Sequence, residues 1–116
     1  MRYGWKEMAK QYEVKISPQA ERDLEGVSEW IIDQSGFVRT AFNYVRRIRA
    51  FITGLKNFPH RGTKRDDLYS GIRIVGFERR VSITFTVTDD TVLIARIFYG
   101  GRDVEALMAD DEGLSG

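Results

Sequence analysis

A chain of 116 residues is long enough for one domain with a single hydrophobic core and too short for a second independent one. With 42% hydrophobic and 30% charged residues, no long apolar run and no signal-peptide pattern in residues 1–11, the sequence predicts a soluble cytoplasmic protein without membrane contacts. The lack of cysteine excludes disulfides, a thiol nucleophile and cysteine-ligated zinc, and a single histidine leaves little for a metal site, so we expect no metal and no cofactor.

Charge is unevenly distributed along the chain. Residues 1–36 hold 5 Lys/Arg and 7 Asp/Glu, residues 37–102 hold 13 and 5, and residues 103–116 hold 0 and 5. A basic central block favours an anionic partner, either a nucleic acid, an enzyme bound to nucleic acid or an acidic peptide segment. A plain solvated surface is equally compatible with this distribution.

The first predicted elements are a short strand and a helix. Residues 12–16 alternate apolar and polar side chains, which indicates a strand with one buried face. Ser17 is suited to cap a helix and Pro18 to its first turn, and Gly36 is suited to its end. The apolar stripe of this helix is Ala20, Leu24, Val27 and Ile31, widened by Trp30.

A second helix is predicted directly after the short connection at Ser35 to Phe37, so the two helices should form an antiparallel hairpin. Pro59 should end it at or before Phe58, and residues 60–67 are predicted to form a loop. The apolar stripe of this second helix is Ala41, Val45, Ile48, Ile52 and Leu55. The opposite face of the helix is mostly positive.

Three strands are predicted next, within residues 71–75, 80–87 and 91–99, with a tight turn at 88–91. The second alternates apolar residues with Ser82, Thr84 and Thr86, which predicts one buried and one wet face. The third is almost entirely apolar, as in a central strand. Residues 104–108 are predicted to form a short helix, and residues 109–116 to be peripheral, like residues 1–11.

The order of these elements predicts an α+β domain of two layers. We expect an N-terminal strand, an antiparallel helical hairpin packed on a mainly antiparallel sheet of about four strands, and a short C-terminal helix. All 116 residues should form one domain with its core in residues 12–103. The sheet face away from the helices should be open to a partner.

Arginines are the candidate functional residues of the strand region. Arg73, Arg79, Arg80, Arg96 and Arg102 lie in or beside it, and together they would bind phosphate or carboxylate. Tyr99 ends the last strand, but a tyrosine with a reference pKa near 10 and the loop residue His60 are poor candidates for proton transfer beside these arginines. Arg96 should be held by a structural carboxylate, for which Asp103 and Glu78 are nearest in sequence.

Four features occur in a fixed order: the helix start at Ser17–Ala20, the helix exit at Phe58–Gly62, the three strands, and the ending Gly100–Asp103. Together they resemble the ParE/RelE superfamily of bacterial toxins, and the ParE branch more closely. The resemblance implies a toxin of a type II toxin–antitoxin pair that traps DNA gyrase on cleaved DNA without catalysing a reaction itself. The implied target-binding residues are Arg73, Arg80, Tyr99 and Arg102.

Two alternatives remain open at this point. The chain could be a RelE-like, metal-independent endoribonuclease of messenger RNA, for which the resemblance implies Arg73, Arg80 and Tyr99 as catalytic residues. It could also be a toxin-fold protein that has lost toxicity and binds only its antitoxin.

A ParD-like antitoxin is the partner that the resemblance implies, with a segment that orders upon the toxin to give a hetero-oligomer. Since the sequence shows no DNA-binding module of its own, operator DNA should be bound only through that antitoxin. The expected antitoxin-binding residues are Trp30, Phe37, Arg46 and Arg49, although the two aromatic residues could equally be core and the two arginines a solvated face.

Overall fold

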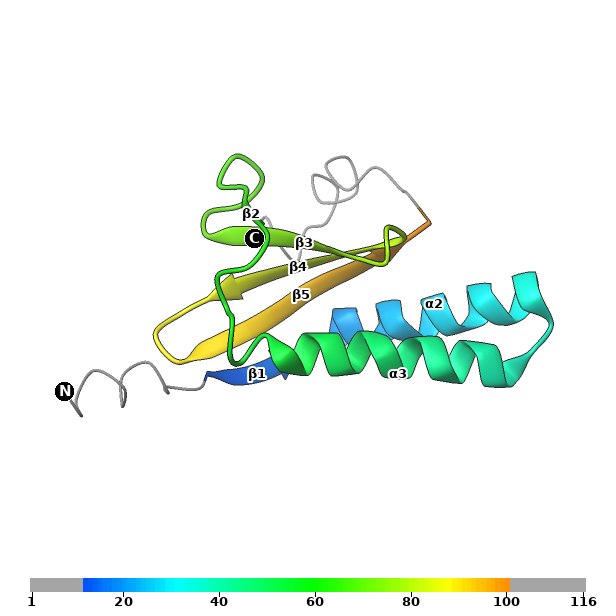
Figure 1. Ribbon diagram of the computed structural model, residues 1–116. Coiled ribbons are helices and arrows are strands. Elements are labelled where there is room, and N and C mark those ends of the chain that lie inside the picture. The colour runs from blue at the N-terminus through cyan, green and yellow to red at the C-terminus, as the bar shows by residue number, and fades with distance from the viewer. Residues whose placement is uncertain (1–11, 101–116) are drawn as a thin grey trace.

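Two helices cover one face of a five-stranded sheet in the computed structural model, which describes residues 12–100 (Figure 1). The predicted short helix, the segments 1–11 and 109–116, and the residues Arg102 and Asp103 lie outside the described range. The elements in chain order are β1 (Glu13–Ile16), α2 (Pro18–Ser35), α3 (Val38–Gly54), β2 (Thr63–Lys64), β3 (Ile72–Phe77), β4 (Val81–Val87) and β5 (Thr91–Tyr99).

The sheet has the strand order β1-β5-β4-β3-β2. β1 pairs with β5 in parallel, and the other three pairs are antiparallel, so the predicted mainly antiparallel sheet and the internal position of β5 are confirmed. The additional strand is β2, two residues within the segment that was predicted to be a loop. Such a short strand carries no alternation of apolar and polar residues by which its sequence could reveal it.

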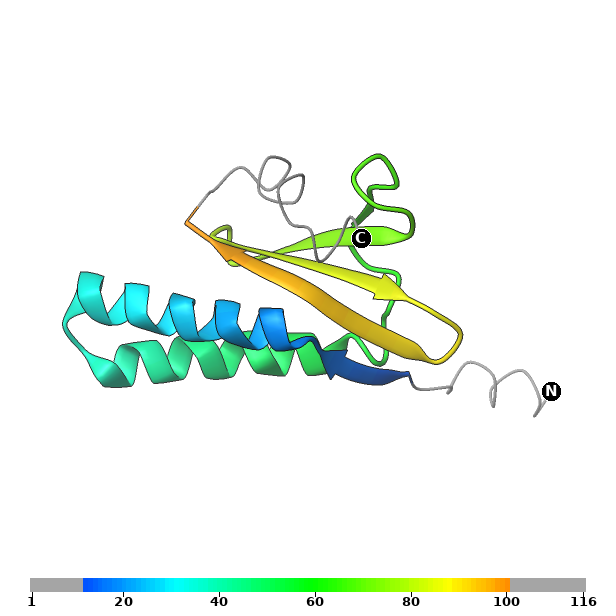
Figure 2. The ribbon, with the colours of Figure 1, turned by 180° about the vertical axis from the view of Figure 1, so that it is seen from behind.

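The predicted ends of α2 are confirmed. The Ser17 side chain accepts a hydrogen bond from the Ala20 N–H at 3.0 Å, and Pro18 occupies the first turn. At the other end Gly36 adopts a left-handed conformation with φ 79°, and its N–H donates to the Ile32 carbonyl at 2.7 Å. This left-handed ending lets the chain turn at once into α3, so the helices run side by side and antiparallel (Figure 2).

The core lies between the helical hairpin and the sheet. Leu24 and Val27 of α2 and Ile48 and Ile52 of α3 are buried there. The sheet contributes Val75, Val81, Ile83, Phe85, Val92, Ile94 and Ile97. Neither helix of the described range is long and apolar enough to cross a membrane.

The opposite face of the sheet is partly covered, which corrects the expectation of a wet face. Thr84 of β4 is fully buried, and a second, smaller cluster joins Ile72, Ala95 and Phe98 with Leu68. A β-bulge between β4 and β5 at Thr84 and Phe85 places the threonine hydroxyl against the β5 backbone, where it accepts from the Arg96 N–H at 3.0 Å. A polar residue is therefore buried here because the bulge gives it a hydrogen-bond partner.

Candidate functional site

The outer edge of β5 changes its neighbour half-way along the strand. β1 pairs with residues 91–94 of β5 and then ends. From there α2 supplies the partners: the Ser17 N–H donates to the Ile94 carbonyl at 3.0 Å, and the Ser17 hydroxyl donates to the Ala95 carbonyl at 2.9 Å. The start of α2 thus continues the hydrogen bonding of the sheet with a capping residue in place of a strand.

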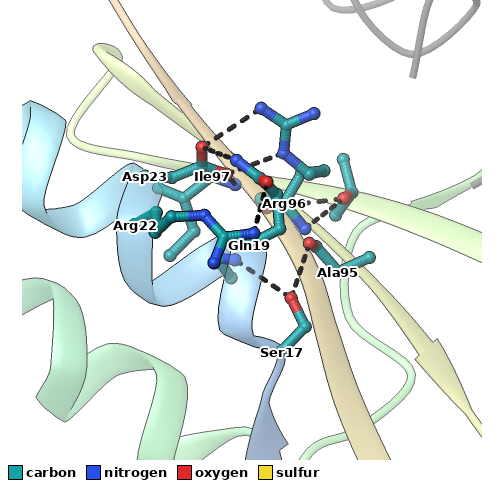
Figure 3. Close-up of polar contacts among 9 residues, drawn as sticks. Ser17, Gln19, Arg22, Asp23, Ala95, Arg96 and Ile97 are labelled. Carbon is teal, nitrogen blue, oxygen red and sulfur yellow. Dashed lines mark hydrogen bonds and ion pairs between the residues drawn. The ribbon is translucent and has the colours of Figure 1, made fainter. Parts of the chain in front are cut away.

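Asp23 of α2 holds the next part of this edge (Figure 3). Its Oδ2 accepts from the Ile97 N–H at 2.9 Å and from Arg96 Nε at 2.8 Å, while its Oδ1 accepts from Arg96 Nη2 at 3.1 Å. The two side chains of this ion pair are only 18% and 10% exposed. One carboxylate therefore joins α2 to both the backbone and a side chain of β5.

A structural carboxylate holds Arg96, as predicted, but in the described residues it is Asp23, and the expectation of Glu78 was wrong. Glu78 instead accepts two hydrogen bonds from Arg47, and Asp103 lies outside the described residues. Asp23 was missed because it is 73 residues away in sequence and lies on the polar face of a helix, which predicts solvent exposure. Only the tertiary arrangement brings that part of α2 to the edge of β5.

Beyond Asp23 a groove of about 460 Å³ runs between α2 and the end of β5. One wall is formed by α2 residues four positions apart, Arg22, Gly26 and Trp30, with Val27 beside them. The other wall is the β5 segment 97–99, continued by Gly100. Trp30 and Gly100 also line a second hollow, together with Glu78, Arg79 and Arg80.

Aromatic rings close the inner side of the groove. The rings of Trp30 and Tyr99 are 4.6 Å apart between centroids, and Tyr44 of α3 packs edge-on against Tyr99 at 5.9 Å and against Phe77 at 6.0 Å. The Tyr44 hydroxyl is buried and has no hydrogen-bond partner in residues 12–100. Burial raises the pKa of this hydroxyl, so Tyr44 is protonated at neutral pH.

The β3–β4 turn lines the second hollow and has an unusual backbone. Glu78 and Arg79 have φ values of 50° and 63°, in the left-handed region that disfavours residues with a Cβ. Arg47 of α3 anchors the turn through two hydrogen bonds of 3.0 Å to Glu78, and its guanidinium lies 4.9 Å from the centre of the Tyr44 ring. The Arg47 hydrogen bonds lower the pKa of the Glu78 carboxyl, so this group is ionised.

The structure brings together only some of the arginines singled out in the sequence. Arg80 and Tyr99 lie at the same end of the sheet, because Val81 pairs with Tyr99 and the Gly100 N–H donates to the Arg80 carbonyl at 2.9 Å. Arg73 pairs with Phe85, four residues along β3 from Phe77, a separation of about 13 Å at the usual rise of a strand. Its guanidinium donates to the His60 carbonyl at 3.0 Å, so Arg73 does not join the cluster.

The residues expected to bind a partner helix or segment lie on the hairpin. Trp30 and Phe37 are 41% and 65% exposed, so they are surface residues. Arg49 is already paired with Glu21 of α2 at 2.7 Å, whereas Arg46 makes no ion pair with another described residue.

Val38 and Phe42, which sequence reasoning missed, are 69% and 61% exposed beside Phe37. They lie next to the predicted apolar stripe of α3, and their side of the helix faces away from the sheet. The sequence could have indicated this exposed patch, because Phe42 is an apolar residue directly beside Ala41 of the stripe.

Comparison with known proteins identifies the family. The model of the family described as ParE toxin of type II toxin–antitoxin system, parDE, matches residues 14–104. The chain belongs to the ParE toxin family. A comparison with curated protein sequences gave no match.

Solved structures support the ParE fold. The chromosomal ParDE toxin–antitoxin system from P. aeruginosa contains a chain 23% identical to this one, with a TM-score of 0.67 over 78% of this chain and 97% of that chain. A chain of the RelBE2 toxin–antitoxin complex from Mycobacterium tuberculosis is 20% identical, with a TM-score of 0.60 over 81% and 97%. At these identities the likeness establishes the α+β fold.

Proposed function

We propose that this ParE-family toxin acts in the cytoplasm by binding DNA gyrase and trapping it on cleaved DNA. The observation that carries the proposal is the chemistry at the end of β5. There Arg79 and Arg80 line a hollow with Gly100, the residue after Tyr99. The carboxylates of Glu78 and Asp23 are held by other arginines. Such a site is equipped to bind an anionic surface and poorly equipped to transfer protons.

Cleavage of RNA at the 2′-hydroxyl needs a proton acceptor and a proton donor beside the phosphate. Asp23 is bonded to Arg96 and to the Ile97 N–H, and the lowered pKa of Glu78 makes it a weak base. The imidazole of His60 packs edge-on against Tyr12, with ring centroids 6.4 Å apart, in the same region as Arg73 and away from Tyr99. These positions favour a binding role over the ribonuclease alternative.

The antitoxin is the second partner in this proposal. Phe37, Val38 and Phe42 form an exposed apolar patch at the end of the hairpin. Arg46, which forms no ion pair with residues 12–100, lies one turn further along α3. A ParD-like segment with apolar and acidic residues would complement this surface and give a hetero-oligomer. Operator DNA would then be bound through the antitoxin.

Parallel assays of the purified chain test the proposal. We expect it to inhibit supercoiling by gyrase and to cause cleaved DNA to accumulate, while messenger RNA on translating ribosomes stays intact. Arg80→Ala should weaken the inhibition, and Lys15→Ala, an exposed site on β1, should not. Ribosome-dependent cleavage of messenger RNA that is lost in Tyr99→Phe would overturn the gyrase proposal in favour of the ribonuclease.

A further inference from the structure

Two arginines, Arg61 and Arg73, lie beside the short strand β2, at the end of β3 that lies away from Arg80. We call them the loop arginines. The Arg61 guanidinium lies 5.0 Å from the centre of the Phe51 ring of α3, and the Arg73 guanidinium donates to the His60 carbonyl at 3.0 Å. Neither guanidinium forms an ion pair with a carboxylate of residues 12–100.

The backbone that carries the loop arginines is held against β3. Gly62 has a φ of 80°, and a Cβ atom there would collide with the Ile74 carbonyl oxygen, so only glycine lets the chain approach β3 this closely. The next two residues, Thr63 and Lys64, pair with Ile74 and Arg73. The two loop arginines therefore have fixed positions relative to each other.

The carboxylates of this region are already neutralised. Segment 60–80 contains three acidic residues, and each has a cation beside it. The ion pairs are Asp66 with Lys64, Asp67 with Arg65 and Glu78 with Arg47. The positive charge of the loop arginines is not cancelled in this way, so their surface favours an anion from outside the described chain.

The contacts of the loop arginines suit them to phosphate. An arginine offers five N–H donors in a planar fork that matches the oxygens of a phosphate group. The Phe51 ring and the His60 carbonyl orient the two guanidiniums without neutralising them, because neither contact carries a negative charge. Binding of the DNA backbone by such cations depends on the phosphates and requires no recognition of bases.

We propose that the loop arginines bind the phosphate backbone of duplex DNA. The toxin then contacts DNA at one end of β3 and its protein target at the other end, through Arg79 and Arg80. The inference rests on the proposed function in choosing DNA over an acidic protein, because a toxin that traps gyrase on cleaved DNA lies next to a duplex. These phosphate contacts add an affinity that decreases with ionic strength.

Fluorescence anisotropy with a short labelled DNA duplex and the full chain tests the contact directly. Arg61→Gln with Arg73→Gln should weaken binding at least tenfold at about 50 mM salt. The slope of log affinity against log salt should become shallower by about 2, because each phosphate contact contributes about 1. Equal affinity and slope in this glutamine variant and the wild type, or a wild type that does not bind the duplex, would overturn the inference.

Two further variants separate charge from folding. Arg61→Lys with Arg73→Lys keeps both positive charges and should keep the salt slope of the wild type. Lys15→Gln with Arg39→Gln removes two exposed cations of β1 and α3 and should bind DNA like the wild type. Melting curves show whether each variant is folded. A lysine variant that is folded but has the shallow slope of the glutamine variant would contradict a role for the charges.

The same titration with other anions identifies the partner. Duplex RNA bound more tightly than DNA, with the same loss in the glutamine variant, would assign this surface to RNA. An affinity for the antitoxin that the glutamine variant loses, while its DNA binding stays unchanged, would assign the surface to an acidic protein. Either result overturns duplex DNA as the ligand.

Gyrase assays distinguish failure of the inference from failure of the proposed function. The wild type and the glutamine variant should bind gyrase equally in the absence of DNA, whereas the variant should need a higher concentration to make cleaved DNA accumulate. Equal accumulation by the two proteins would overturn the inference and leave the proposed function intact. A wild type that does not bind gyrase would contradict the proposed function, and the duplex titration would still decide the inference.

Discussion

The two exposed edges of the sheet are built in opposite ways. At one edge β2 is only two residues long, both exposed, and it carries Lys64 beside the paired Arg65 and Asp67. Short length and charge are the features by which natural sheets prevent edge pairing. At the other edge, the end of β5 has aromatic and apolar residues, a backbone whose outer side no strand within residues 12–100 pairs with beyond Ile94, and a glycine opposite it. The difference teaches that one edge is protected from pairing while the other is kept available for it.

Removing the ion pair that joins β5 to α2 should have the largest effect on stability. Asp23→Ala removes the carboxylate that binds both the Arg96 guanidinium and the Ile97 N–H in a nearly buried site, so we expect a loss of about 3–5 kcal/mol in unfolding free energy. Urea denaturation measures it. Asp23→Asn, which keeps an acceptor but not the charge, should lose less.

Replacing Arg96, the other member of this ion pair, tests its structural role. Arg96→Ala should also lower the melting temperature markedly. A variant that remained as stable as the wild type but lost toxicity would show that Arg96 belongs to the target-binding site instead.

The β3–β4 turn should gain stability when its strain is removed. Each left-handed residue with a Cβ costs about 1–2 kcal/mol. The ion pair of Arg47 and Glu78 is exposed, so solvent screens it and it contributes little to stability. Glu78→Asn with Arg79→Gly should therefore stabilise the chain by about 1 kcal/mol in chemical denaturation and weaken gyrase inhibition, since Arg79 is gone. A stabilised variant with full inhibition would show that these side chains do not contact the target.

Gly26→Ala tests whether the groove is open on the α2 side. The substitution should raise the unfolding free energy by about 0.5–1 kcal/mol, because alanine favours the helix and its methyl group meets open space. A loss of stability in thermal unfolding would mean that the groove is filled in the free protein.

The smallest expected effect is a pH dependence of the stability that the β3–β4 turn contributes. The Arg47 hydrogen bonds lower the folded-state pKa of Glu78 below its usual 4.5, so the pair stabilises the fold above that pH and loses its effect as the pH falls through the folded-state value. The stability difference between wild type and Glu78→Gln should therefore shrink as the pH is lowered below the usual pKa of 4.5 and through the folded-state value. A difference that stayed constant over this range would exclude Glu78 as its source.

Local signals predicted much of the fold. Ser17, Pro18 and Gly36 each act on the backbone within a few residues, so the sequence was sufficient to place the ends of α2. The almost wholly apolar β5 was correctly predicted to be internal, because its alternation-free pattern reflects burial on both faces.

The site was less predictable because it depends on long-range geometry. The partnership of Asp23 with Arg96 requires both the end of β1 and the bulge in β5. The turn at Glu78 and Arg79 lacks the glycine or asparagine that normally marks left-handed turns, so its left-handed backbone could not be predicted. Phe37 is exposed because the hairpin extends past the sheet, which no helical stripe can reveal (Figure 1).

Charge-matched double variants test the central claim most directly, namely that the end of β5 is the part of the toxin that binds its target. Arg79→Ala with Arg80→Ala removes two positive charges beside the groove, and Lys15→Ala with Lys64→Ala removes two from β1 and β2. Measured as the concentration that halves gyrase supercoiling, inhibition should weaken at least tenfold in the arginine pair and stay unchanged in the lysine pair. Equal weakening in both pairs, or loss only in the lysine pair, would contradict the account.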